Sequence, residues 1–150
     1  MKEYINKSNM NLDNLLINNK SIHMMGVINA TPDSFSGDGI FSDKNNFDIL
    51  ETCQSMIDAG VGIIDVGGES TRPKSIYKQV VEISEDEEID RVIPLIKTIR
   101  KNFKIPISID SKKIKEIKEA IKEGASLVND ISMLEDVNLI ELLKKHDIYY

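Results

Sequence analysis

This sequence is poor in cysteine, in aromatic residues and in long apolar runs, and each shortage excludes a class of protein. The single Cys53 cannot form an internal disulfide, which is typical of a reducing, intracellular environment. No apolar run approaches the roughly 18 residues of a membrane span, and the first residues lack the apolar segment of a signal peptide. We therefore expect a cytoplasmic protein with no membrane partner.

Basic residues are also in deficit. The 19 Lys and Arg residues are outnumbered by 25 Asp and Glu residues, which gives a formal net charge of −6 and a pI near 5.0. Such a charge disfavours non-specific attraction to nucleic acid. Because the net charge of the protein repels anions, an anionic ligand would have to be bound by local donor groups. The 150 residues are 41% hydrophobic, which is enough for one domain with a real core.

What the chain does contain is a regular alternation of strand and helix patterns after a polar start. Residues 1–20 are rich in Asn and Lys and suggest an N-terminal extension or an edge hairpin. From residue 21 onward, apolar runs alternate with segments of helical spacing. The predicted strands are 23–29, 62–68, 106–111 and 126–132, the predicted helices are 45–60, 84–103, 112–124 and 135–147, and 148–150 is the start of a fifth strand.

Alternating strands and amphipathic helices predict right-handed βαβ units and a parallel sheet. An open doubly wound sheet and a (β/α)₈ barrel both fit this order. Each predicted strand carries a polar residue at or near its carboxyl end, namely Asn29, Asp65, Asp110 and the pair Asn129 and Asp130. That pattern favours the barrel, whose active site is built from several strand ends. A full barrel needs about 250 residues, so the prediction is α/β, the N-terminal half of a TIM barrel: four βα units and the start of a fifth strand.

Three sequence features are longer and more specific than structure alone requires. They are NATPDSFSGDG at 29–39, DVGGESTRP at 65–73, and the pair ISIDS at 107–111 and LVNDIS at 127–132. In this order and at this spacing they closely resemble the dihydropteroate synthase family. The resemblance runs from about Met24 to the last residue and covers roughly the N-terminal half of the family's pterin-binding barrel, placed here at 21–150.

The resemblance implies a condensation in folate biosynthesis. Para-aminobenzoate displaces diphosphate from a hydroxymethyl-dihydropterin diphosphate and gives dihydropteroate. The family uses Mg²⁺ to spread the charge of the leaving diphosphate, and its members usually form homodimers. The expected partners are therefore these two small-molecule substrates, the cofactor is Mg²⁺, and nucleic acid is not expected.

The resemblance also assigns roles to single residues. Asn29 matches the residue that contacts magnesium and diphosphate, and Asp110 and Asn129 match the pair that recognises the pterin edge. Asp65 matches a position that hydrogen-bonds near the pterin. The remaining matches lie in two loops that contact the substrates: Thr31, Pro32, Asp33, Ser34 and Phe35 in the first, and Thr71 and Arg72, which contact aminobenzoate and diphosphate, in the second.

Several residues have structural readings as well. Asp110 would serve as an N-cap of the next helix, and Asp130 either lines the site or orders its loop. Gly67 and Gly68 permit a close backbone approach to a ligand or special dihedral angles. The acidic run at 85–88 suits the positive end of its own helix and is assigned no catalytic role.

The sequence departs from the family in two ways. Lys74 and Ser75 follow STRP where the family has Gly-Ala, and the second half of the barrel would have to follow Tyr150. That half supplies a further pterin-contacting Asp, a loop Lys and an Arg/His pair for diphosphate. If the chain is complete, we expect poor activity. The alternative is therefore a catalytically incomplete pterin- or diphosphate-binding half-barrel. The related pterin-binding domain of methyltransferases ranks last, because it should lack the TPDSF and ESTRP motifs.

Overall fold

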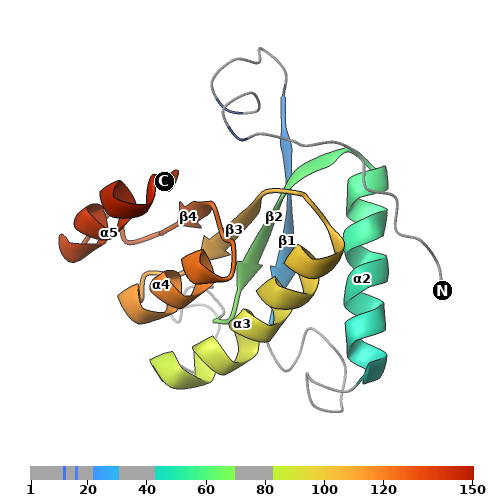
Figure 1. Cartoon of the computed structure of the whole chain (residues 1–150), viewed down its shortest axis with the longest axis horizontal. Helices are drawn as coiled ribbons and strands as arrows, with labels where there is room; N and C mark the ends of the chain where they lie inside the picture. Colours follow the sequence, from blue (N-terminus) through green and yellow to red (C-terminus); the bar gives the residue numbers. More distant parts are fainter. Residues whose placement is uncertain (1–11, 13–15, 17–21, 31–42, 70–82) are drawn as a thin grey trace, which may run out of the picture.

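The computed structural model describes residues 12, 16, 22–30, 43–69 and 83–150, without the side chains of 43–48. Within these described ranges, four strands and four helices alternate from residue 24 onward (Figure 1). The strands are β1 (Met24–Asn29), β2 (Val61–Gly67), β3 (Ile107–Asp110) and β4 (Leu127–Asn129). The helices are α2 (Asp43–Asp58), α3 (Glu85–Asn102), α4 (Ile114–Lys122) and α5 (Asn138–His146). The predicted alternation is confirmed, with boundaries shifted by a few residues.

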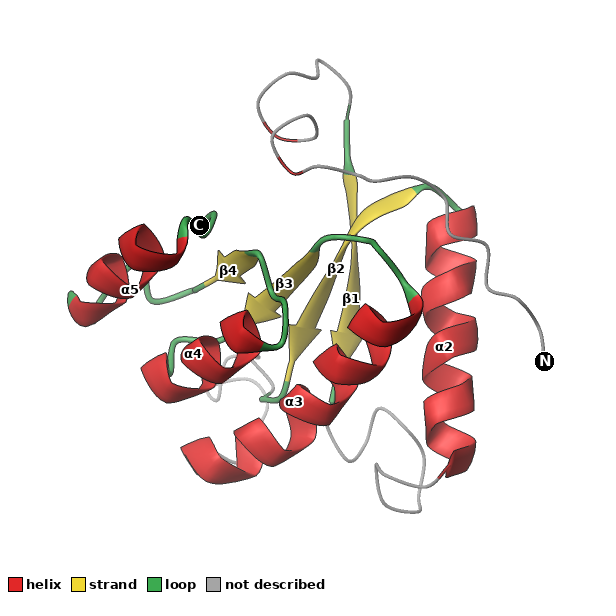
Figure 2. Ribbon diagram, viewed as in Figure 1, coloured by secondary structure: helices red, strands yellow, loops and turns green. Residues whose placement is uncertain are grey.

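The four strands form one sheet in the order β1-β2-β3-β4, and all three neighbouring pairs are parallel. In a barrel the strands lie side by side in chain order, whereas in a doubly wound sheet the strand order reverses at one point. The observed order therefore fits a barrel. Beyond β4, Tyr149 forms a parallel bridge with Leu127, so the chain begins a fifth strand where it was predicted. Figure 2 shows the strands side by side and the helices following them in chain order.

One face of the sheet packs on the helices and holds the main core. Ile64, Val66, Ile107, Ile109 and Val128 alternate along β2, β3 and β4 with residues of the other face, and all are buried in one cluster. The helices add apolar residues at helical spacing, such as Val92, Ile96 and Ile99 of α3. Cys53 of α2 is fully buried in this cluster, and burial raises the pKa of its thiol to about 12.

The other face of the sheet corresponds to the interior of a barrel. Two rows of paired residues cross it: Val27, Asp65, Ser108 and Leu127, and then, one step nearer the carboxyl ends, Asn29, Gly67, Asp110 and Asn129. Apolar residues of β1 on this side remain open, with Met25 40% and Val27 51% exposed. A closed barrel would cover these side chains from the opposite side.

The N-terminal stretch is described at two positions only. Leu12 is buried and clusters with Ile63, Leu127 and Tyr149 on the interior face, whereas Leu16 is exposed. The assignment of 1–20 as an extension or an edge hairpin otherwise lies outside the described residues and stays a prediction, as does the domain boundary at residue 21.

Two element boundaries differ from prediction because polar side chains take up backbone donors. The fourth strand was expected to reach 132 but ends at Asn129, since the Asp130 carboxylate accepts from the backbone N–H groups of Ser132 and Leu134 at 2.7 and 3.1 Å. Helix α5 was expected from 135 but begins at Asn138, whose backbone N–H is bound by the Asp136 carboxylate at 2.9 Å. Side-chain oxygens of this kind compete with regular backbone pairing.

Candidate functional site

The polar residues predicted at the strand ends meet along one edge of the sheet. Asn29, Asp110 and Asn129 are the last residues of β1, β3 and β4, and Gly67 is the last residue of β2. The register pairs Asn29 with Gly67, Gly67 with Asp110, and Asp110 with Asn129. The four residues therefore form a continuous row at the carboxyl end of the parallel sheet, where barrel enzymes bind their substrates.

Asp65 lies two residues before Gly67 on β2, and a hydrogen bond joins it to the row. Its side chain is buried, and the Asn129 side-chain Nδ2 donates a hydrogen bond to Asp65 Oδ2 over 3.0 Å. The other carboxylate oxygen, Oδ1, is buried without a hydrogen-bond partner among the described residues, as is the hydroxyl of its register partner Ser108. Unpartnered buried polar atoms are rare in folded proteins, so this pair marks a place suited to a polar ligand or water.

Ser108 was not singled out from the sequence. It occupies an ordinary strand position, and only its register beside Asp65 gives it a place on the interior face.

Asp110 is half-buried and surrounded by negative charge. Burial, followed by the charges of Asp65, Glu88 and Asp130, raises the pKa of its carboxyl from 3.8 to about 6. The N-cap reading is wrong: helix α4 is preceded by Lys113, and the Lys113 backbone N–H is bound by the Ser111 hydroxyl at 3.0 Å. No hydrogen bond occupies the Asp110 carboxylate within the described part of the chain, which leaves it available as an acceptor.

Asn29 is exposed at the end of β1, at the first position of the row. Its amide oxygen is a hard donor of the kind that Mg²⁺ accepts. The described residues contain no group of three or more His, Cys, Asp and Glu side chains that could hold a metal by themselves. An exposed amide oxygen of this kind fits a cation that takes few protein ligands and completes its shell with phosphate oxygens and water, as Mg²⁺ does.

The predicted loop residues fall outside the described part of the chain. These are Thr31, Pro32, Asp33, Ser34 and Phe35 of the first loop, and Thr71 and Arg72 of the second. Their roles stay predictions. Ala30, directly after Asn29, is buried, and its backbone N–H donates to the Gly67 carbonyl at 2.7 Å.

The two glycines of the second motif differ in their surroundings. A Cβ on Gly68 would lie 2.6 Å from Glu88 Cγ and 2.8 Å from Val92 Cγ2, so this glycine permits close packing of β2 on α3. A Cβ on Gly67 would lie 3.4 Å from the Cβ of Asp110, within ordinary contact. Neither has a positive φ, and in the described ranges only Gly60 and Gly124 among glycines do. The prediction that Gly67 and Gly68 adopt special backbone dihedral angles is therefore wrong.

Asp130 proves to be a loop-ordering residue. Besides its two backbone contacts, its carboxylate accepts from the hydroxyls of Ser132 at 2.8 Å and Tyr150 at 3.3 Å. These donors hold a turn in which Met133 and Leu134 both have positive φ, at 55° and 63°. An L residue rarely adopts that conformation without such support.

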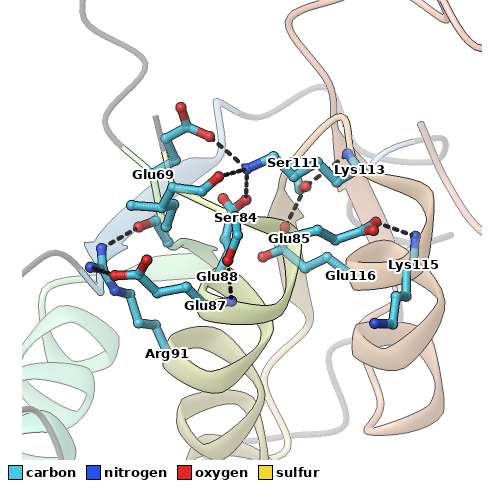
Figure 3. A network of polar contacts seen from close by, with 12 residues as sticks. Glu69, Ser84, Glu85, Glu87, Glu88, Arg91, Ser111, Lys113, Lys115 and Glu116 are labelled. Carbon is cyan, nitrogen blue, oxygen red and sulfur yellow. Dashed lines mark hydrogen bonds and ion pairs between the residues drawn. The ribbon is translucent and has the colours of Figure 1, made fainter. Parts of the chain in front are cut away.

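A buried polar cluster between α3 and α4 was missed by sequence reasoning. It contains Lys113, Glu69, Glu88, Ser111 and Glu116 (Figure 3). Glu88 belongs to the acidic run that was assigned only to the helix terminus, yet it is buried and forms an ion pair with Lys113 at 2.7 Å. The available signal was its spacing: Glu88 shares a helix face with the apolar Val92, Leu95 and Ile99.

Glu116 is fully buried at the base of this cluster. Burial first, and then the negative charge of Glu88, raise the pKa of Glu116 to about 8, against the opposing hydrogen bond from Ser111. Ser111 Oγ donates to Glu116 Oε2 at 2.6 Å. The second oxygen, Oε1, has no hydrogen-bond donor within the described ranges, so an ionised Glu116 would leave one charged oxygen unsatisfied. Burial therefore favours the protonated form of Glu116.

Comparison with known proteins agrees with this arrangement of strand ends. A family model described as "Pterin binding enzyme" matches residues 25–150. The chain belongs to the pterin-binding enzyme family. Within the family, the resemblance to dihydropteroate synthase is confirmed. The Clostridium beijerinckii dihydropteroate synthase is 46% identical over 128 residues, covering 84% of this chain and 45% of that protein. The Escherichia coli K12 enzyme is 43% identical over 119 residues, covering 79% of this chain and 40% of its own length.

Solved structures match in the same region. The Clostridium difficile dihydropteroate synthase, determined in the presence of pteroic acid, superposes with a TM-score of 0.76 at 40% identity, covering 86% of this chain and 47% of that one. The Yersinia pestis enzyme in complex with a sulfonamide drug gives a TM-score of 0.69 at 39% identity, covering 84% and 43%. The chain thus spans less than half the length of the relatives it matches and corresponds to roughly half of their barrel. No helix in the described ranges has the length and apolar character to cross a membrane.

Proposed function

We propose that this chain forms the N-terminal half of a dihydropteroate synthase active site, which condenses para-aminobenzoate with hydroxymethyl-dihydropterin diphosphate. The observation that carries the proposal is the row Asn29, Gly67, Asp110 and Asn129 at the carboxyl end of the sheet, with Asp65 bonded behind it. Membership of the pterin-binding enzyme family and the similarity to dihydropteroate synthases support it.

Asp110, Asn129 and Asp65 are the proposed pterin-binding residues. A pterin presents an aminopyrimidinone edge in which donors and acceptors stand side by side. A carboxylate such as Asp110 accepts two N–H groups, and an amide such as Asn129 offers one acceptor and one donor. One of the two Asn129 Nδ2–H groups is engaged by Asp65 at 3.0 Å, which orients the amide and leaves its oxygen and the other N–H for the ligand. A wrong ligand would leave these buried groups unpaired, which gives strong discrimination.

Asn29 is the proposed contact to magnesium and diphosphate. When bound, Mg²⁺ would neutralise charge that develops on the leaving diphosphate. The chain's own contribution is one neutral amide oxygen at the carboxyl end of the sheet, in the same row as the pterin-binding pair and separated from it by Gly67. Thr71 and Arg72 are the proposed contacts to aminobenzoate and diphosphate, and Thr31, Pro32, Asp33, Ser34 and Phe35 complete the first loop. A cytoplasmic location stays a prediction.

Binding without catalysis is the second candidate. It is favoured by the character of the described row, whose amide and carboxylate groups can recognise a pterin edge. The chain spans less than half the length of its relatives, so the activity of the whole enzyme is a separate question from ligand binding by this part.

Complementation separates the two candidates. The chain is expressed in a synthase-deficient bacterium, alone and together with the C-terminal half of the Clostridium beijerinckii enzyme. Growth without folate end products only in the second case supports a half-site that needs its complement. Growth with the chain alone would show that the described half suffices. No growth in either case, with pteroic acid binding detected by calorimetry, would support binding only. No growth and no heat with pteroic acid would contradict both.

A further inference from the structure

Ser111 follows Asp110 directly, and both its backbone N–H and its hydroxyl are engaged. The N–H donates to the Asn129 carbonyl at 3.1 Å, one residue beyond the last paired position of β3. The hydroxyl donates to Glu116 Oε2 at 2.6 Å and accepts from the Lys113 backbone N–H at 3.0 Å. Ser111 is buried, and hydrogen bonds away from water are stronger than exposed ones. One residue therefore joins the end of β4 to helix α4.

Glu116 offers that hydroxyl an acceptor in a fixed place. It lies on α4 and is fully buried, as are Ile117 and Ala120 of the same helix. Figure 3 shows its carboxyl group facing the Ser111 side chain. Its second oxygen, Oε1, is buried without a hydrogen-bond partner in the described part of the chain. Breaking the bond to Ser111 is therefore costly, because a buried carboxyl group would lose its donor.

The link from α4 reaches both members of the proposed pterin-binding pair. Asp110 is the chain neighbour of Ser111, and the Asn129 carbonyl accepts from the Ser111 N–H. The Asp110 side chain lies close to the backbone of β2, since a Cβ on Gly67 would come within 3.4 Å of Asp110 Cβ and 3.5 Å of its Oδ2. No hydrogen bond from the described residues holds the Asp110 carboxylate, so its position depends on this packing and on its own backbone.

We propose that Ser111 and Glu116 are positioning residues: their hydrogen bond holds the backbone that carries Asp110 and Asn129 at the spacing that one pterin edge requires. Neither residue belongs to the strand-end row, because the Ser111 hydroxyl bonds to α4 on the helix side of the sheet. Groups that are held in place before binding lose less conformational freedom when the ligand arrives. The ligand part of this inference rests on the proposed function.

Amide exchange of the 150-residue chain, followed by NMR, tests the link without any ligand. The amide to follow is the Ser111 N–H, whose acceptor is the Asn129 carbonyl. Glu116→Met removes the acceptor of the Ser111 hydroxyl and leaves the Ser111 backbone unchanged. We expect the Ser111 N–H to exchange at least about ten-fold faster in this variant, because one hydrogen bond no longer fixes the residue. Amides of β2 should change by less than about two-fold.

Two control variants separate the bond from its surroundings. Glu116→Gln keeps an oxygen acceptor in a neutral group, which matches the form of Glu116 that burial favours, and should leave the Ser111 N–H within about two-fold of wild type. Ser84→Ala removes a hydroxyl that accepts from the Glu87 backbone N–H at 3.2 Å at the start of α3. It has the cost of a lost helix cap but should leave the Ser111 N–H unchanged.

The ligand test measures the Kd for 6-hydroxymethylpterin by calorimetry at pH 7. Glu116→Met and Ser111→Ala should each raise the Kd about ten-fold, because the two binding groups lose their fixed spacing. Glu116→Gln and Ser84→Ala should stay within about two-fold. The double variant of Ser111→Ala with Glu116→Met should bind no more weakly than either single variant, since both substitutions remove the same bond. Ser111→Ala also keeps the test open if Glu116→Met fails to fold.

Several results would overturn the proposal. One is a wild-type Kd in Ser111→Ala and Glu116→Met, and another is a loss in Glu116→Gln as large as in Glu116→Met. Additive losses in the double variant would also overturn it, because two independent effects would then be present. Wild-type protein that gives no heat with 6-hydroxymethylpterin would contradict the proposed function, while exchange of the Ser111 N–H would still decide whether this bond holds the strand ends.

Discussion

Asn129 donates a hydrogen bond from its side-chain Nδ2 to Asp65 Oδ2 over 3.0 Å, across the strand that separates β4 from β2. The bond joins residues 64 positions apart in the sequence. The bond gives one oxygen of the buried Asp65 carboxylate a hydrogen-bond donor. It also fixes the orientation of the Asn129 amide at the end of β4. The relationship gives Asn129 both a structural and a recognition role.

The first prediction tests that bond. Asn129→Leu should lower the free energy of unfolding by about 1–3 kcal/mol, because the buried Asp65 carboxylate would lose its partner. Urea unfolding at pH 7 measures the change. The double variant Asp65→Leu with Asn129→Leu should lose less stability than the Asn129→Leu variant alone, since no buried carboxylate is then left unpaired. Additive losses in the double variant would contradict the coupling.

The second prediction concerns the pH dependence of ligand binding. The pKa of Asp110 is raised to about 6, and a carboxylate must be ionised to accept two N–H groups. Affinity for 6-hydroxymethylpterin should therefore fall as the pH falls through 6, and should be roughly ten-fold weaker at pH 5 than at pH 7. Isothermal calorimetry at both pH values measures it. Asp110→Asn should bind weakly with no such dependence, and a wild-type affinity that is flat between pH 5 and 7 would contradict the assignment.

The third prediction concerns Asn29. In the chain completed by a C-terminal half, Asn29→Ala should raise the magnesium concentration needed for half-maximal activity by about ten-fold or more, as loss of groups around a metal commonly does. Binding of 6-hydroxymethylpterin should change little, because Asp110 and Asn129 are untouched. A magnesium titration of the rate and a pterin titration give the two numbers. Equal loss of both would sink the assigned role.

The fourth prediction concerns the buried Glu116. Its folded pKa of about 8 lies above the unfolded value of 4.5, so the folded state holds a proton that the unfolded state releases between these values. Stability should therefore fall as the pH rises from 4.5 towards 8. Glu116→Gln keeps the shape without an ionisable group and should be more stable than wild type by roughly 1–3 kcal/mol at pH 7.

Urea unfolding at pH 5 and pH 8 measures the effect of Glu116→Gln. The advantage of the variant should be larger at pH 8 than at pH 5. The control is Glu119→Gln on the same helix, where the carboxylate pairs with Lys122 on the surface. A wild-type stability that rises between pH 5 and 8, or an advantage of the variant that is no larger at pH 8 than at pH 5, would contradict a raised pKa for Glu116.

The sequence by itself determined the order of elements, their direction and the residues at the strand ends. Apolar periodicity is a local property, and strands joined by helices must run parallel, so Asn29, Asp110 and Asn129 were predicted at one edge before any contact was known. The motifs around them identified the family because they exceed what turns and caps require. Even the start of a fifth strand, seen as the bridge of Tyr149 to Leu127, followed from a short apolar pattern.

Only the tertiary structure decided which of these residues touch. The Asn129–Asp65 bond, the place of the Ser108 hydroxyl beside Asp65 and the ordering role of Asp130 depend on strand register and on the path of a turn. The same holds for Lys113, whose partners lie 25 to 44 positions away in the sequence. Charged side chains in a sequence look alike whether they are solvated or buried, because burial is set by packing between distant segments. For that reason Glu88 and Glu116 became visible as a buried pair only when α3 was placed against α4.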